Sequence, residues 1–106
     1  MPSSTEYTIT VNVIYRSTEI MLAACDSELL GKEFKEGRLR LKVSKSFYGG
    51  DSMNTEDFLR NLQNATIANL VGERTIAAAV EAGYIDAECI LMVAGTPHAQ
   101  LFLCEA

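Results

Sequence analysis

The residues best suited to chemistry lie in one short stretch, residues 44–51, with the sequence Ser-Lys-Ser-Phe-Tyr-Gly-Gly-Asp. Glycine adopts positive φ angles at no steric cost, so Gly49 and Gly50 could turn adjacent backbone N–H groups toward a single point. Such a concave arrangement of N–H groups binds anions. Hydroxyl and ammonium groups that could join it come from Ser44, Lys45 and Ser46. The stretch therefore predicts an anion-binding loop.

Two aromatic residues in this stretch, Phe47 and Tyr48, allow other interpretations. If they pack on the core, the diglycine marks only a tight turn, as such pairs most often do. If they are exposed, either ring could stack on a nucleic-acid base. The sequence leaves these alternatives open.

A cluster of basic residues precedes the loop. Six of the nine Lys and Arg residues fall between positions 32 and 45, where the only acids are Glu33 and Glu36. The alternation of residues 38–43 predicts a strand whose Leu and Val residues face inward. The opposite face then presents a row of cations, which are Arg38, Arg40 and Lys42. This row could face an anionic partner, or it could simply deter pairing at an exposed strand edge.

A second candidate anion site lies in residues 65–74. Residues 65–68 fit either a short buried strand or a helix that continues into the next one. A break is favoured because Asn69 is a good helix cap and Gly72 is a poor helix-interior residue. A phosphate could then rest at the helix start near Gly72. This segment has one glycine, whereas a Rossmann fingerprint has three, and it lacks the Gly-Lys-Ser/Thr sequence of a P-loop. Both of these nucleotide-binding motifs are therefore excluded.

The hypothesis of an enzyme rests on His98, the single histidine. It falls in a predicted turn over residues 94–98, where a carboxylate and Gln100 could orient it for proton transfer. No nucleophile accompanies it, because Asp26 beside Cys25 would raise the thiol pKa and Ser46 lacks an elbow motif. The histidine could equally hydrogen-bond its own turn.

The three cysteines, Cys25, Cys89 and Cys104, are odd in number and lack Cys-x-x-Cys spacing. This pattern predicts reduced, buried thiols in a cytoplasmic protein. Neither a metal site nor a cofactor is expected, because structural zinc normally draws its ligands in close pairs.

Composition indicates one domain. The chain has 106 residues, a net charge of −5 and a pI of about 4.8. We expect a disordered N-terminus over residues 1–6 and a single domain over residues 7–106. No stretch resembles a signal peptide or a membrane span, so we expect a cytoplasmic protein that does not bind membranes.

Periodicity predicts an α+β fold. Residues 7–15 alternate as a half-buried strand, and an apolar run over residues 20–24 completes a hairpin. Helical patterns follow at residues 55–64 and 73–82, and strand patterns at residues 89–93 and 99–103. We expect a small two-layer domain, with a mostly antiparallel sheet and two main helices packed on one side.

Several segments together resemble an archaeal family known only as domain of unknown function 424. The matching segments are residues 23–26, 29–32, 46–50, 65–74, 81–83 and 95–100. The resemblance implies a compact cytosolic α+β protein associated with translation, and it supplies no catalytic residues. Arg40, Lys42 and Lys45 do not belong to the family pattern.

These observations favour a non-catalytic binding module for RNA or a translation-associated partner, acting through the basic strand and the Gly-Gly loop. The alternative is a small enzyme or anion-binding protein that uses His98 and the same loop. The sequence leaves the oligomeric state open.

Overall fold

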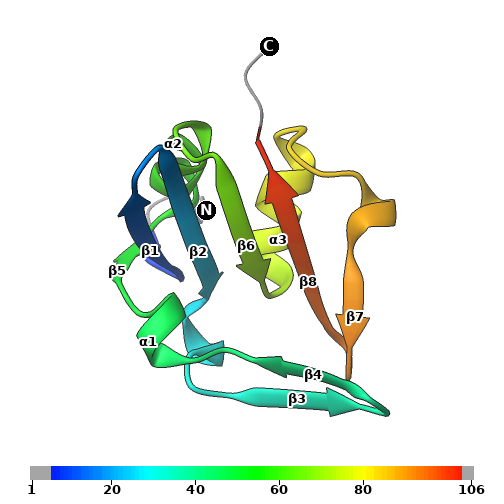
Figure 1. Cartoon of the computed structure of the whole chain (residues 1–106). Coiled ribbons are helices and arrows are strands. Elements are labelled where there is room, and N and C mark those ends of the chain that lie inside the picture. The colour runs from blue at the N-terminus through cyan, green and yellow to red at the C-terminus, as the bar shows by residue number, and fades with distance from the viewer. Residues whose placement is uncertain (1–5, 104–106) are drawn as a thin grey trace.

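A six-stranded sheet with two helices on one face forms most of the molecule (Figure 1). The computed structural model describes residues 6–103. Strand order in the sheet is β5-β1-β2-β6-β8-β7, in which only β2 and β6 run parallel. The strands are β1 (Ile9–Arg16), β2 (Glu19–Asp26), β5 (Asp51–Met53), β6 (Ile67–Val71), β7 (Leu91–Val93) and β8 (Thr96–Phe102). The predicted fold class is confirmed, and the predicted disorder of residues 1–6 lies outside the described residues except at Glu6.

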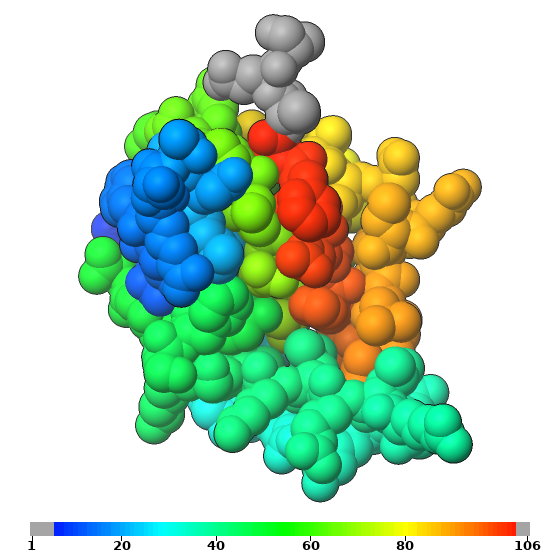
Figure 2. Space-filling model, viewed as in Figure 1, coloured from blue at the N-terminus to red at the C-terminus, as the bar shows by residue number. Residues whose placement is uncertain are grey.

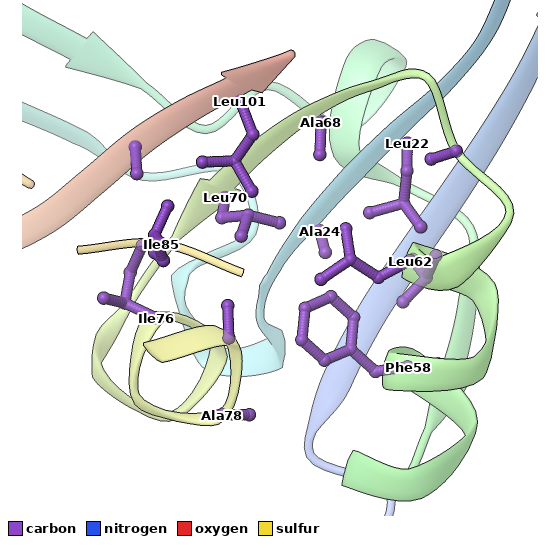
Figure 3. Close-up of a cluster of buried hydrophobic side chains, with 14 of the residues drawn as sticks. Leu22, Ala24, Phe58, Leu62, Ala68, Leu70, Ile76, Ala78, Ile85 and Leu101 are labelled. Atoms are coloured by element: carbon purple, nitrogen blue, oxygen red, sulfur yellow. The ribbon is translucent and has the colours of Figure 1, made fainter. Parts of the chain in front are cut away.

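The two main helices are α2 (Thr55–Gln63) and α3 (Glu73–Glu81). Asn54 accepts a hydrogen bond from the Asp57 N–H at 2.8 Å and so caps the start of α2. Phe58 and Leu62 of α2 meet Ile76 of α3 and Leu70 of the sheet in one buried cluster (Figure 3). Truncating a fully buried ring such as Phe58 to alanine costs about 3–5 kcal/mol. Burial of this apolar face holds both helices on the same side of the sheet.

Strand β6 occupies the middle of the sheet, between β2 and β8. The predicted break between the two helices is correct, but Asn69 does not cap a helix. It lies within β6, and Gly72 precedes α3 instead. Because β6 pairs with a strand on each side, two sets of backbone hydrogen bonds override the local capping preference of asparagine.

A separate two-stranded sheet, β3 (Glu33–Glu36) and β4 (Leu39–Lys42), crosses the molecule below the main sheet (Figure 1). Its turn is Gly37–Arg38, in which the glycine has a positive φ of +60°. The predicted strand over residues 38–43 is therefore shorter. Val43 still faces inward and is fully buried, whereas Leu39 near the turn is 42% exposed.

A second hydrophobic cluster lies on the sheet face opposite α2 and α3. It joins sheet residues such as Cys25, Val71 and Val93 to Leu41 of β4 and Tyr48 of α1 (Lys45–Tyr48). The hairpin and α1 thus cover the lower part of this face. Its upper part comprises the outward residues of β2, β6 and β8 that lie outside this cluster, and no other element of residues 6–103 covers it (Figure 2). We call this the open face.

The C-terminal hairpin turns at Ala94–Gly95, where both residues have positive φ, 51° and 83°. Two consecutive positive φ angles characterise the tight type I′ turn. Strand β8 therefore begins at Thr96, and the prediction of a longer turn over residues 94–98 is wrong.

Candidate functional site

The outward face of the β3–β4 hairpin carries a row of exposed cations. Lys35 lies directly opposite Arg40, and Glu33 lies opposite Lys42. All four side chains are exposed. Arg40 forms an ion pair with Glu33 at 3.1 Å, in which the two side chains are 66% and 36% exposed. An ion pair this exposed contributes little, about 0–1 kcal/mol, so it leaves Arg40 free to exchange partners.

The hairpin is held to the main sheet by its inner face. Phe34 and Leu41 pack in the second hydrophobic cluster with Val93 of β7. The Glu36 carboxylate also accepts a hydrogen bond from the Ala94 N–H at 2.7 Å. These contacts fix the position of the hairpin, and with it the backbone that carries the outward cations. Arg38 lies apart from the row, in the turn at the tip.

Short helix α1 follows the hairpin and contains several of the predicted loop residues. The Ser44 hydroxyl accepts from the Phe47 N–H at 3.3 Å and caps the helix, while the Ser46 hydroxyl lies 3.5 Å from that of Ser44. Lys45 and Ser46 are exposed. Ser44 therefore caps the helix, and the exposed Lys45 side chain lies beside Gly31, where an added Cβ would be 3.3 Å from Lys45 Cε.

The diglycine does not form the predicted concave arrangement of N–H groups. Gly49 has φ −71° and donates its N–H to the Lys45 carbonyl at 2.9 Å. Neither Gly49 nor Gly50 is among the glycines with positive φ. A Cβ on Gly50 would lie 2.1 Å from the Val11 carbonyl oxygen. Glycine is needed here because two backbone segments approach closely, and the positive-φ prediction is wrong.

The two aromatic residues of the loop face the core. Tyr48 is only 4% exposed, and burial raises the pKa of its hydroxyl to about 12. Its ring meets that of Phe47 edge to face, with centroids 5.0 Å apart. Phe47 is half-buried against the second cluster. Tyr48 therefore cannot stack on a base, and the interpretation in which these aromatic residues pack on the core is correct.

The start of α3, where a phosphate was predicted, holds one of the protein's own carboxylates. Asp26 accepts hydrogen bonds from the Arg74 N–H at 3.1 Å and the Thr75 N–H at 2.9 Å. Gly72 has φ +108°, and a Cβ there would lie 2.4 Å from Asp26 Cγ. Since an internal anion already occupies the helix N-terminus, a phosphate would have to displace it.

Three predicted residues, Asn69, His98 and Gln100, come together on the open face. Ala68 and Leu70 of β6, and Ala99 and Leu101 of β8, belong to the cluster under the helices. Alternation sends the side chains between them to the other face. Asn69 pairs directly with Gln100 across the two strands.

Residue His98 lies within β8 rather than in a turn, and burial lowers its pKa. No ion pair between His98 and a carboxylate occurs in the described part of the chain. The predicted contact between His98 and a carboxylate is therefore not formed among these residues.

Comparison with known families identifies the chain. The profile of a protein family of unknown function, DUF424, matches residues 15–103. The chain belongs to the DUF424 family. A crystal structure of an uncharacterized conserved protein from Methanopyrus kandleri is similar, with 28% sequence identity and a TM-score of 0.74. The match covers 89% of this chain and 90% of that protein. No curated protein matches.

Two exposed side chains of this DUF424 protein were not predicted as site residues, although Lys35 belongs to the basic cluster between positions 32 and 45. Lys35 joins the cation row because β3 alternates, with Phe34 inward and Lys35 outward. Phe102, which is 75% exposed, lies on the open face two residues beyond Gln100. The alternation of residues 98–102 would have predicted that Phe102 shares a face with His98 and Gln100. The wrong prediction of a turn over residues 94–98 assigned His98 to the turn instead of the strand.

The cysteines of the DUF424 chain differ in environment. Cys25 is fully buried, and burial together with Asp26 and Glu28 raises its pKa to about 12. Cys89 is exposed, so the prediction that it is buried is wrong. It lies in a short 3-10 turn (Ala87–Cys89) outside the sheet. Cys104 lies outside the described residues.

Within residues 6–103, no three His, Cys, Asp or Glu side chains form a metal-binding group. No helix in this range is long and apolar enough to cross a membrane.

Proposed function

We propose that this DUF424 protein is a non-catalytic RNA-binding module whose β3–β4 hairpin contacts phosphate groups. The observation that supports this most directly is the exposed row of Lys35, Arg40 and Lys42 on one face of the hairpin. Cations at alternate positions of paired strands can each reach a different phosphate of one chain.

The distribution of the remaining cations strengthens the proposal. Outside positions 32–45 the chain has three basic residues, Arg16, Arg60 and Arg74. Arg60 pairs with Asp57 at 2.7 Å, and Arg74 pairs with Glu28. Arg40 pairs with Glu33 in the same way, but the four lysines and Arg38 between positions 32 and 45 form no ion pair within residues 6–103, so unpaired positive charge gathers on and beside the hairpin. Such a localised field can attract a polyanion to an acidic protein.

Salt dependence tests the proposal. Labelled transfer RNA would be titrated with the wild type and with the triple variant Lys35→Gln/Arg40→Gln/Lys42→Gln, between about 50 and 200 mM salt. Each lost phosphate contact flattens the slope of log K against log salt by about 0.7–0.9, so the triple variant should lose about 2–3 units of slope. Arg60→Gln, which removes an equally exposed charge from α2, serves as the control and should bind as the wild type does.

Two outcomes would overturn this function. The first is a wild type that does not bind RNA. The second is a triple variant that keeps the affinity and salt slope of the wild type. If that variant also aggregates, the cations serve to deter strand pairing.

A further inference from the structure

The open face of the main sheet carries apolar, aromatic and amide side chains, a combination typical of a binding surface. Its side chains, on three adjacent strands, include Glu19, Met21, Ile67, Asn69, His98, Gln100 and Phe102. Figure 2 shows this face toward the viewer, with the hairpin along its lower edge. No described helix covers it, since α2 and α3 pack against the other face.

We infer that this open face contacts the unpaired bases of single-stranded RNA, while the hairpin holds the phosphates. The inference rests on the proposed function and specifies its substrate class. Four observations support it.

The first is a pair of amides with free hydrogen-bonding groups. Asn69 and Gln100 are direct partners in the β6–β8 register, so their side chains stand about 5 Å apart. The side-chain hydrogen bonds among residues 6–103 involve neither of them, nor His98. Each amide offers a donor and an acceptor, which is what the edge of an unpaired base requires.

The second is the exposed ring of Phe102. It is 75% exposed although it lies on a strand whose neighbours Ala99 and Leu101 are buried. Ile67, its direct partner on β6, is half-buried beside it. An exposed aromatic ring on a sheet surface provides a flat platform on which a base can stack.

The third is the scarcity of acids. The chain contains 14 Asp and Glu residues. Only one, Glu19, lies at an outward position of β2, β6 or β8 on the open face, and it is at the very start of β2. The Glu19 carboxylate there accepts a hydrogen bond from the Thr66 hydroxyl. A polyanion on the face would therefore meet almost no repulsion.

The fourth is continuity with the hairpin. The Glu36–Ala94 hydrogen bond fixes the hairpin beside the start of β8. From His98 to Phe102, β8 rises by about 13 Å. This length matches about four stacked nucleotides at roughly 3.4 Å each. One strand of RNA could thus cross from the hairpin cations to Phe102 without a break.

A duplex does not suit this arrangement. Bases in a helical duplex are stacked on each other and paired, so a flat sheet cannot reach their edges or faces. The open face therefore predicts a preference for single strands, whereas the hairpin alone predicts none.

Binding of labelled ten-nucleotide RNA, single-stranded and as the matching duplex, tests the inference. The variant Phe102→Ala should weaken single-strand binding by about five- to 150-fold, without changing duplex binding or the salt slope. Gln100→Ala, at another exposed position, should also weaken it. Tyr15→Ala is the matched control, because Tyr15 is likewise 75% exposed but lies at the end of β1. It should bind as the wild type does.

The variants separate the two proposals. If Phe102→Ala and Gln100→Ala both bind single strands as the wild type does, or if the duplex binds as tightly as the single strand, the open face is not a base-binding site. If the hairpin triple variant binds normally while Phe102→Ala does not, the proposed role of the hairpin fails instead. Should sedimentation show that Phe102→Ala converts a dimer to a monomer with RNA binding unchanged, the face contacts a second copy and the inference is wrong.

Discussion

The Asp26 carboxylate, at the end of β2, accepts hydrogen bonds from both the backbone N–H and the hydroxyl of Thr75, at 2.9 and 2.8 Å. These residues are separated by almost half of the chain, and both are buried. The contact ties the first hairpin to α3 and supplies the start of that helix with a negative charge. Gly72 is required beside it, because any larger residue would collide with the carboxylate.

Replacement of Asp26 should therefore be strongly destabilising. Asp26→Ala would leave the Thr75 hydroxyl and two helix N–H groups without their partner, at a cost of about 3–5 kcal/mol in the free energy of unfolding. Urea denaturation would measure this. Glu28→Gln, on an exposed neighbouring acid, should cost about 0.5 kcal/mol or less. A loss below about 1 kcal/mol for Asp26→Ala would show that this carboxylate does not organise the helix start.

Sequence periodicity was sufficient for the elements that bury one face. The alternation of Ile9 and Val11 located the first strand, and Phe58 and Leu62 located the face of α2 that packs on the sheet. These patterns depend only on local geometry. The sequence could not show that the β3–β4 hairpin folds onto the opposite face, because contacts such as Leu41 with Val93 join distant segments.

Individual site residues were harder to predict, for a related reason. Asn69 suggested a helix cap and His98 a turn, as both do in isolation. The pairing of β6 with β2 and β8 placed both residues on strands instead. Their convergence with Gln100 is therefore a product of sheet register, which no single segment encodes.

The revised role of the diglycine leads to a second prediction. Since a Cβ on Gly50 would lie 2.1 Å from the Val11 carbonyl oxygen, Gly50→Asn should cost about 2–3 kcal/mol in unfolding free energy. Gly37→Asn is the matched control. Gly37 has φ +60° and open space around it, and asparagine tolerates that conformation, so the change should cost about 0.5 kcal/mol or less. Equal stability of the two variants would restore the interpretation of Gly50 as an ordinary loop glycine.

The cysteines should differ sharply in reactivity. With a pKa of about 12, only about one Cys25 thiol in 10⁴ is ionised at pH 8, and the side chain is fully buried. In a Cys104→Ser background, maleimide should label exposed Cys89 at least about 100-fold faster than Cys25. Mass spectrometry of digested protein would follow each site. In urea the two rates should converge, and rapid labelling of Cys25 in the native protein would contradict the buried position of β2.

The lowered pKa of His98 predicts how its contribution to stability depends on pH. Burial lowers the folded-state pKa below the ordinary value of 6.5, so the unfolded chain binds more protons between these two pKa values. Stability should therefore fall as pH decreases through 6.5 toward the folded-state pKa, and this part of the loss should disappear in His98→Gln. Urea midpoints of the wild type and the variant, measured at several pH values from neutral to mildly acidic, isolate the histidine, because all other titrating groups are shared. If the difference between the two proteins stays constant with pH, then β8 does not shield His98 from solvent, and the imidazole is as free on the open face as it is in the unfolded chain.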